Sequence, residues 1–469
     1  MGPLPSFLIW LLATIPLAEP APRDPAQPGP ASGYRLPRPH IHPDWGKQII
    51  RRKDEDADWV NSKMVLRYPL QQAEVNVTDF PERKIRPGER AVDERLRGRL
   101  AKRDNNWNWK HLEDYRGFLY FIEIELGEPP QKVILTPDTG SFETWVNPNC
   151  EYSASPILCQ VNGEYDPGFS SAAEPLDETF QFVYGSGWAV GQYYTDRMYF
   201  RRALVDEDVG IKQRFGMAWD SDYAVSGILG LGYGRGYNLE YDNILDSLVE
   251  YGVINAQIYS VALGQIGSGT SEIVFGGVNV GRYSGYLRPV PVWPSVNDQP
   301  ENWVHYWVNL TSLSYTTPRG STTIFRGAPV NALVDTGSTY TLLPAVVVDA
   351  LADELGAWRE VGEWKVDCAL RDMLGTADFE FGDVVIRVPY SDFLLRLPDE
   401  SCSLGVQKRE GEEGEESEAI LGDTFLRGAY VVFDQVSHNL WMANHEDCGS
   451  EVREVGILRG DPGTLRGLC

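Results

Sequence analysis

The sequence predicts an all-β protein of two similar lobes, with a few short helices and the functional site between the lobes. Three observations point to this fold class: an internal duplication, stretches in which apolar and polar residues alternate, and abundant glycine. The 469-residue chain has 46 glycines, and 42% of its residues are hydrophobic. This composition supports a sizeable core and many tight turns between short strands.

Two short motifs occur twice, in the same order and at nearly the same spacing. The Asp-Thr-Gly triplet that begins at Asp138 recurs 197 residues later at Asp335. The Ile-Leu-Gly triplet that begins at Ile228 recurs 192 residues later at Ile420. A single Asp-Thr-Gly would mean little, because roughly one chain in ten of this length contains one by chance. Two motifs that repeat together indicate two lobes of similar length.

Most of the regular structure is expected to be strand. Residues 120–126 alternate apolar side chains with glutamates, and residues 384–388 and 429–433 are rich in β-branched and aromatic side chains. A helix is expected at 243–252, where apolar residues recur at helical spacing and the last residue is a glycine. A second helix is expected at 344–355, which begins with a proline and is followed by a glycine.

The N-terminal part of the chain has the composition of a leader. Residues 1–18 contain an apolar run too short to span a membrane, as in a signal peptide. The alternative, a buried N-terminal helix, is disfavoured by the prolines directly behind this run. Residues 22–103 then hold 18 Lys and Arg against 12 Asp and Glu, whereas residues 104–469 hold 24 against 54. We therefore expect a basic propeptide over 19–103.

The change of charge falls at the dibasic pair Lys102-Arg103, which a processing peptidase of the secretory pathway could cut. On its own such a pair is often only a solvated surface feature. The opposite charges of leader and body favour their association, as an inhibitory propeptide would require.

Several function classes are excluded by composition and missing motifs. The formal net charge of −25 argues against a nucleic-acid-binding protein, which needs a basic face. No apolar run is long enough for a membrane helix, and the C-terminal residues lack the apolar tail of a lipid-anchor signal, so no membrane anchor is expected. The chain has no His-Glu-x-x-His metal motif, no Gly-x-Ser-x-Gly nucleophile motif and no phosphate-binding loop, so neither a metal nor a cofactor is expected.

The two Asp-Thr-Gly loops suggest acid–base chemistry. Each follows an apolar strand and places one carboxylate on a tight turn, where glycine permits close backbone approach. The threonine hydroxyls could tie the two loops together across the lobe interface. If Asp138 and Asp335 meet in a buried site, they cannot both ionise readily and will share a proton. One can then act as a general base on water while the other acts as an acid on a substrate carbonyl.

Together these motifs resemble those of pepsin-like aspartic endopeptidases of the secreted, fungal-like zymogen type. The resemblance covers about residues 115–447, and Trp145, seven residues after Asp138, is part of it. So is Tyr184-Gly-Ser-Gly, which is similar to the tip of the hairpin, called the flap, that closes over substrate in this family. Proton sharing by paired aspartates is the known behaviour of these enzymes, and the resemblance extends it to Asp138 and Asp335.

The resemblance also implies roles for neighbouring residues. It implies substrate binding by Tyr184, Gly185, Ser186, Gly140, Gly337, Ser338 and Thr339. It implies support of the active site by Thr139, Thr336, Ser141 and Trp145, with Tyr184 hydrogen-bonded to Trp145.

The same resemblance divides the body and pairs its cysteines. It implies an N-terminal lobe at 104–288, a C-terminal lobe at 289–447 and a tail at 448–469, which we expect to be loose. Six cysteines allow fifteen pairings. The resemblance favours Cys150–Cys159 and Cys368–Cys402, which leaves Cys448–Cys469 as the third pair. N-glycosylation sequons occur at Asn76 and Asn309, of which only Asn309 lies in the predicted mature enzyme.

Two residues depart from the family pattern. Pro137 precedes the first aspartate, where the family usually has a large apolar residue, and proline removes a backbone donor from a strand. We therefore expect altered pairing of the first loop. Phe142 replaces a small polar residue, and we expect it near the substrate cleft, where it would reshape a subsite.

The predicted function is that of a secreted aspartic endopeptidase, made as a zymogen and acting at acid pH on bonds between bulky apolar residues. Its expected partners are a polypeptide substrate, its own propeptide and a dibasic-site processing peptidase, and it is expected to be a monomer. Delivery to an acidic vacuole is an alternative destination. Two other functions remain open: a non-catalytic binding protein of the same fold, which Pro137 favours, and a glycosidase that uses a carboxylate pair.

Overall fold

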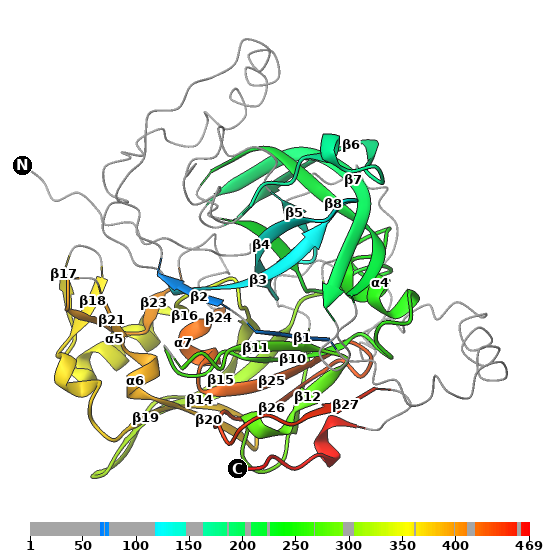
Figure 1. The fold of residues 1–469 in the computed structure, drawn as a ribbon. Coiled ribbons are helices and arrows are strands. Elements are labelled where there is room, and N and C mark those ends of the chain that lie inside the picture. The colour runs from blue at the N-terminus through cyan, green and yellow to red at the C-terminus, as the bar shows by residue number, and fades with distance from the viewer. Residues whose placement is uncertain are drawn as a thin grey trace, which may run out of the picture.

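The structure is a computed structural model, and it shows two lobes that share a further sheet (Figure 1). It describes residues 66–69, 71–74, 118–146, 163–184, 187–201, 208–222, 226–266, 268–293, 304–360, 363–397, 399–409, 418–456 and 461–469. Several predicted features lie outside these residues: the signal peptide, Asn76, the Lys102-Arg103 site, the Cys150–Cys159 pair, Gly185 and Ser186.

The N-terminal lobe is built on an eight-stranded sheet. Its order is β2-β3-β4-β9-β5-β8-β7-β6, and β3 also pairs with β7. The strands are β2 (Gln71–Glu74), β3 (Phe118–Leu126), β4 (Gln131–Asp138), β5 (Trp145–Val146), β6 (Glu174–Val183), β7 (Trp188–Arg201), β8 (Asp208–Asp222) and β9 (Gly227–Gly230). The helix predicted at 243–252 is confirmed as α4 (Ile244–Glu250), which Asn243 caps.

The C-terminal lobe is built on a seven-stranded sheet of order β20-β19-β14-β15-β24-β16-β23 and a smaller sheet of order β17-β18-β22-β21. The larger sheet contains β14 (Trp307–Thr317), β15 (Gly320–Val334), β16 (Thr341–Leu343), β19 (Thr376–Phe381), β20 (Val384–Pro389), β23 (Val406–Lys408) and β24 (Ala419–Leu421). The smaller contains β17 (Trp358–Glu360), β18 (Glu363–Val366), β21 (Leu395–Arg396) and β22 (Cys402–Ser403). The helices are α5 (Ala345–Leu355), which confirms the second predicted helix, α6 (Tyr390–Phe393) and α7 (Asp423–Leu426).

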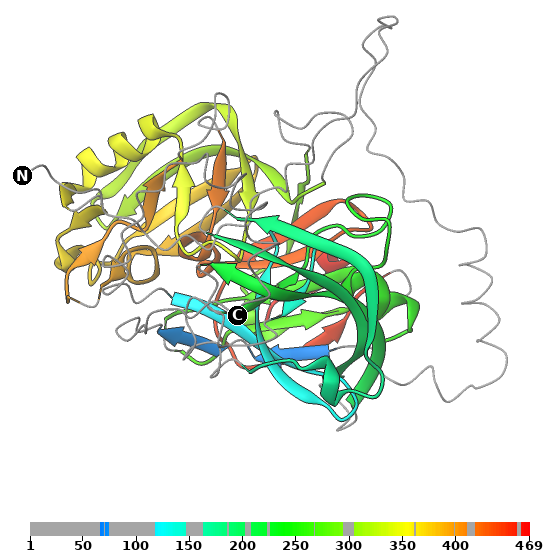
Figure 2. The ribbon, with the colours of Figure 1, turned by 90° about the horizontal axis from the view of Figure 1, so that it is seen from above.

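A six-stranded sheet lies below the N-terminal lobe in Figure 1, and Figure 2 shows the lobes side by side from above. Its order is β1-β11-β10-β25-β26-β13. The strands are β1 (Leu66–Pro69), β10 (Ile258–Ala262), β11 (Glu272–Phe275), β13 (Arg288–Pro291), β25 (Ala429–Asp434) and β26 (Asn439–Asn444). Strand β1 comes from the predicted propeptide, and its Arg67 forms an ion pair with the buried Glu272. The leader therefore supplies an edge strand here, and β2 beside β3 in the N-terminal lobe.

The two lobes repeat one arrangement of four strands. In the N-terminal lobe β4 pairs in parallel with β9, β9 antiparallel with β5, and β5 in parallel with β8. In the C-terminal lobe β15, β24, β16 and β23 pair in the same order and the same directions. The duplication seen in the sequence thus corresponds to a duplication in the fold, and the mostly β, two-lobed prediction is confirmed.

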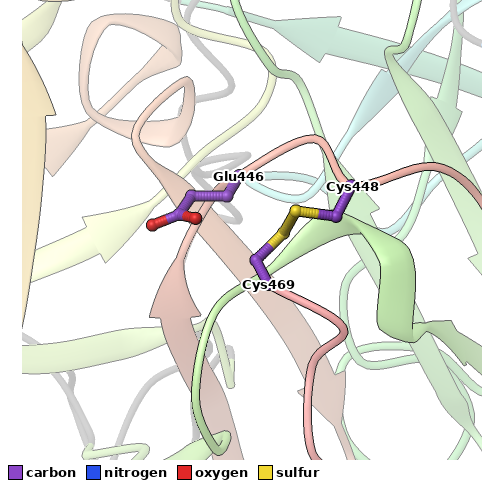
Figure 3. Close-up of side chains that lie close together, drawn as sticks. All are labelled: Glu446, Cys448 and Cys469. Atoms are coloured by element: carbon purple, nitrogen blue, oxygen red, sulfur yellow. A yellow bond between two sulfur atoms is a disulfide. The ribbon is translucent and has the colours of Figure 1, made fainter.

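The segment after the second lobe is more ordered than expected. Strand β27 (Val452–Glu454) pairs with β12 (Gly277–Asn279), and a short 3-10 helix spans Pro462–Thr464. Gly467 lies against the carbonyl of Tyr283, so closely that an added Cβ would be 2.0 Å from that oxygen. A Cys448–Cys469 disulfide closes the segment (Figure 3). The expectation of a loose tail is therefore wrong for the described part of 448–469, because its contacts are tertiary and leave no local sequence pattern.

Candidate active site

The first Asp-Thr-Gly loop begins at the last residue of β4. The Gly140 amide donates to Asp138 Oδ1 at 2.8 Å, and the Ser141 hydroxyl donates to Asp138 Oδ2 at 2.5 Å. Asp138 is 1% exposed. Both of its oxygens thus accept hydrogen bonds from the loop that carries it, and these bonds orient the group.

The second loop repeats this geometry directly after β15. The Gly337 amide donates to Asp335 Oδ1 at 2.8 Å, and the Ser338 hydroxyl donates to Asp335 Oδ2 at 2.7 Å. Ser338 and Thr339 were predicted to bind substrate. In the structure the Ser338 hydroxyl is used by Asp335, and the Thr339 side chain is buried while its carbonyl accepts from the Thr424 amide.

The two threonines join the loops across the lobe interface. Each threonine amide donates to the other hydroxyl: Thr139 N to Thr336 Oγ1 at 3.1 Å, and Thr336 N to Thr139 Oγ1 at 3.0 Å. Each hydroxyl then donates to a carbonyl on the opposite strand, Thr139 to Val334 at 2.9 Å and Thr336 to Pro137 at 2.7 Å. All four bonds are buried, so the relative position of the two aspartates is strongly defined.

Gly337 is the point at which the two carboxylates meet. A Cβ at this residue would lie 2.7 Å from Asp138 Oδ1 and 3.1 Å from Asp335 Oδ1. Only glycine leaves this space free, which explains the third residue of the motif. Burial raises the pKa of Asp138, and burial together with the negative charge of Asp138 raises the pKa of Asp335 well above its usual range. Both shifts make it unfavourable for the two carboxyls to be ionised at the same time.

The Ile-Leu-Gly strands lie directly against the loops. A Cβ at Gly230 would be 2.4 Å from the carbonyl oxygen of Glu143, and one at Gly422 would be 2.3 Å and 2.4 Å from the carbonyl oxygens of Ser338 and Tyr340. Backbone atoms cannot move aside as a flexible side chain can. These glycines are therefore required for β9 and β24 to pass beneath the two loops.

Strands β6 and β7 form the hairpin whose tip was predicted to be the flap. Trp145 Nε1 donates to the Tyr184 hydroxyl at 2.8 Å, which links this hairpin to the chain just after the first loop. Burial raises the pKa of Tyr184 well above its usual value, and the charge of nearby Asp138 raises it further. Gly185 and Ser186 lie outside the described residues, so the structure gives no information on their predicted contacts.

Pro137 does not disturb the pairing of its strand. The register of β4 on β9 continues through Pro137 to Asp138, whose carbonyl accepts from the Leu231 amide at 2.8 Å. Backbone groups of neighbouring strand residues point to opposite sides, so the nitrogen of Pro137 faces away from β9. The expected alteration of the first loop is therefore absent, because proline stands where no ladder donor is needed.

Phe142, the second departure from the family pattern, packs near His305. Its side chain is buried, and its ring centroid is 6.0 Å from that of His305. Burial lowers the pKa of His305 to about 4, so the imidazole is uncharged over most of the acid range. Phe142 therefore packs into the interior, and its predicted effect on a substrate subsite stays a prediction.

Glu143 is a half-buried acidic residue of this site that the sequence analysis missed. It accepts hydrogen bonds from the hydroxyls of Tyr193 and Tyr241, which are 50 and 98 residues away. No local pattern reveals such partners. The available signal was an acidic residue between Asp138 and Trp145, at the entrance to an otherwise apolar strand.

Two of the predicted disulfides are present, Cys368–Cys402 and Cys448–Cys469. Within the described ranges, the one cluster of metal-type side chains is Glu446 with Cys448 and Cys469 (Figure 3). Its two sulfurs are bonded to each other and so are not thiolate ligands.

The glycosylation candidate Asn309 is half-buried in β14. Among the described residues no helix is long and apolar enough to cross a membrane.

The comparisons with known proteins all point to the same protein family. The model of the family described as eukaryotic aspartyl protease matches residues 119–445. The chain is 32% identical over 394 residues to the probable aspartic-type endopeptidase opsB of Aspergillus oryzae, covering 79% of this chain and 77% of the relative. It is 30% identical to the aspartic proteinase yapsin-3 of Saccharomyces cerevisiae, with 79% and 74% covered. It is also 30% identical to secreted aspartic protease 5 of Candida albicans, with 76% and 83% covered.

The matched region contains both Asp-Thr-Gly loops, the hairpin of β6 and β7, and both Ile-Leu-Gly strands. It ends just before the disulfide-closed C-terminal segment. The chain therefore belongs to the eukaryotic aspartyl protease family, as a pepsin-like aspartic-type endopeptidase with fungal relatives.

Proposed function

We propose that the protein hydrolyses peptide bonds at acid pH through a water molecule activated by Asp138 and Asp335. The observation that carries this proposal is the meeting of their two Oδ1 atoms at Gly337. Each carboxylate is held by its own loop, and the two loops are bonded to each other through Thr139 and Thr336. The catalytic groups are thus preorganised before substrate arrives.

The proposed reaction needs no covalent enzyme intermediate. The ionised member of the pair takes a proton from water as the water oxygen bonds to the substrate carbonyl carbon. The protonated member gives its proton to the carbonyl oxygen, which produces a tetrahedral diol. The C–N bond then breaks as the amide nitrogen takes a proton from the pair and a hydroxyl proton returns to it. The proton belongs to the pair, and we assign it to neither aspartate.

Acid pH follows from the same shared proton. Burial favours the neutral form of both carboxyls, but a rise in pH eventually removes the proton that the general acid must donate. The acidic body adds to this effect, since its carboxylates repel one another more as they ionise. We therefore expect activity to fall as the pH approaches neutrality.

Substrate preference, secretion and activation are proposed on other grounds. A preference for bulky apolar residues beside the scissile bond rests on the family resemblance. Secretion rests on the predicted signal peptide and on relatives that are named secreted aspartic proteases. A zymogen is supported by the basic leader, two segments of which, β1 and β2, pair with the body.

The test is peptide hydrolysis by the secreted, processed protein at about pH 3–5, with and without a statine-type transition-state inhibitor. Asp138→Asn and Asp335→Asn should each lower kcat about a thousandfold, within the range that general acid–base groups contribute. Asp353→Asn, on the exposed side of α5, is the matched control and should be fully active.

A folded, processed protein that cuts no peptide would favour the non-catalytic binding protein instead. Cleavage of glycans in a parallel screen would favour the glycosidase. Recovery of the protein from the acid vacuole and not from the medium would correct the proposed destination.

A further inference from the structure

A second group of polar side chains lies beside the active-site loop and is used by no step of the proposed reaction. Its centre is the carboxylate of Glu143, five residues after Asp138 and two before Trp145. The Tyr193 hydroxyl donates to it, at 3.0 Å from each oxygen, and the Tyr241 hydroxyl donates to Oε2. The backbone of Glu143 packs closely against Gly230, which restricts its position.

A half-buried arginine completes this group. The guanidinium of Arg214 lies 4.1 Å from the ring centroid of Tyr193 and 3.9 Å from that of Tyr241. Its two terminal nitrogens bind both oxygens of Glu178, at 3.2 Å and 2.8 Å. Arg214 is therefore held between two aromatic faces, a favourable position for a cation, and its charge compensates the carboxylate beyond the tyrosines.

These contacts join the hairpin of β6 and β7 to the active-site loop at its base. Glu178 and Phe180 belong to β6, and Tyr193 belongs to β7. The ring centroid of Phe180 is 5.5 Å from that of Tyr193 and 4.5 Å from that of Phe182. Phe182 in turn is 6.4 Å from Tyr184. A continuous row of aromatic rings thus connects the Glu143 carboxylate to the tyrosine of the hairpin.

The other end of this row returns to the same loop. Tyr184 accepts the hydrogen bond of Trp145, which follows Glu143 by two residues. The hairpin is therefore attached to one short piece of chain at two points, Trp145 near Tyr184 and Glu143 near the base. Fixing two separate points prevents rotation of the hairpin about either one.

We propose that Glu143 is a positioning residue that holds the β6–β7 hairpin, and with it Tyr184, in the orientation that binds substrate. The inference rests on the proposed function, because it assumes that the hairpin contacts the substrate of the same site. Glu143 acts through Tyr193 and Tyr241 and touches neither carboxylate of the dyad. Its loss should therefore weaken substrate binding and leave the chemical step intact.

The pH dependence of this role follows from the surroundings of Glu143. The groups that face it are Tyr193 from β7, Tyr241 before α4, Arg214 from β8, Glu178 from β6 and Tyr184 after β6. Burial raises the pKa of Glu143, opposed by the two tyrosine hydroxyls and Arg214. Protonated Glu143 and a glutamine are alike in shape and charge. The Glu143→Gln variant and the natural enzyme should therefore converge in KM toward acid pH and separate toward pH 6.

The experiment is the separate measurement of kcat and KM from about pH 3.5 to 6 on the full, processed protein. At the upper end, Glu143→Gln should raise KM about five- to tenfold, as expected for loss of one charge-assisted hydrogen bond, with kcat changed less than about twofold. Tyr193→Phe keeps the ring on Arg214 and removes only the donor, and it should raise KM similarly. The double variant should be no worse than Glu143→Gln alone, because both changes remove one interaction.

The matched control is Glu174→Gln on the same hairpin. Glu174 forms an exposed pair with Lys212 that also spans β6 and β8, at 2.6 Å, but it lies outside the Glu143 group. The Glu174→Gln variant should leave KM unchanged. The proposal is overturned if Glu143→Gln and Tyr193→Phe leave KM unchanged across the pH range, or if they lower kcat at constant KM. Turnover that survives Asp138→Asn would instead overturn the proposed function.

Discussion

The two Asp-Thr-Gly loops have the same internal hydrogen bonds but different surroundings. In both, the glycine amide donates to one carboxylate oxygen at 2.8 Å and the following serine donates to the other. At the position of Glu143 the second lobe has Tyr340, which packs with Trp307, Leu342 and Ile420 in an apolar cluster. In the first lobe this position is surrounded by tyrosine hydroxyls and an arginine. The duplicated part of the fold orients the carboxylates, and the part that is not duplicated supports the hairpin.

The largest expected effect tests the duplicated part. Gly230→Ala and Gly422→Ala should each destabilise the protein by about 3 kcal/mol or prevent its secretion, because the new Cβ would meet backbone atoms. Thermal unfolding measures the loss. Gly327→Ala, with nothing within 4 Å of the added carbon, should change stability by less than about 0.5 kcal/mol. Tolerance of alanine at only one of the two positions would break the equivalence of the lobes.

The threonine pair should give the next effect. Thr139→Val and Thr336→Val each leave one buried carbonyl and one buried amide without a partner. We expect each to cost about 2 kcal/mol in the free energy of unfolding. Thr139→Ser and Thr336→Ser retain the hydroxyl and should lose much less. Chemical denaturation compares them, and a loss confined to one threonine would show that one loop alone holds the interface.

The pH dependence of stability tests the surroundings of Asp246, which lies in the helix α4 that follows the first Ile-Leu-Gly strand. Burial raises the pKa of Asp246 in α4 to about 6, against backbone hydrogen bonds from Arg235 and Asn243 that lower it. The unfolded side chain ionises near pH 3.8, so the folded state binds more protons between pH 3.8 and 6. Stability should therefore fall by about 2 kcal/mol as the pH rises through this window. Asp246→Asn should flatten this part of the stability curve. An unchanged slope would contradict the assignment.

Pro137 should give the smallest effect. Its counterpart Val334 donates its amide to the Tyr306 carbonyl at 3.1 Å, a bond that proline cannot make. Because the nitrogen of Pro137 faces away from β9, Pro137→Val should change stability by less than about 1 kcal/mol and kcat/KM by less than about threefold. A large gain in activity on this substitution would show that the proline impairs the first loop after all.

The sequence was sufficient for the parts of the molecule that repeat or alternate. The spacing of the two motifs predicted the lobes, and the cap and glycine around α4 predicted its ends within two residues. The direction of the Pro137 nitrogen was not predictable, because it depends on which partner strand its neighbours use. The partners of Glu143 and the packing of the C-terminal segment depend on residues far apart in the chain. Such contacts leave no periodic pattern.

The most direct test of the shared dyad is to compare kcat/KM of Asp138→Asn, Asp335→Asn and the double variant on one peptide at about pH 4. Two carboxyls that act as one unit should show equal losses of about a thousandfold in the single variants, with little further loss in the double variant. Substantial activity in either single variant, or losses that multiply in the double variant, would contradict a proton shared between Asp138 and Asp335.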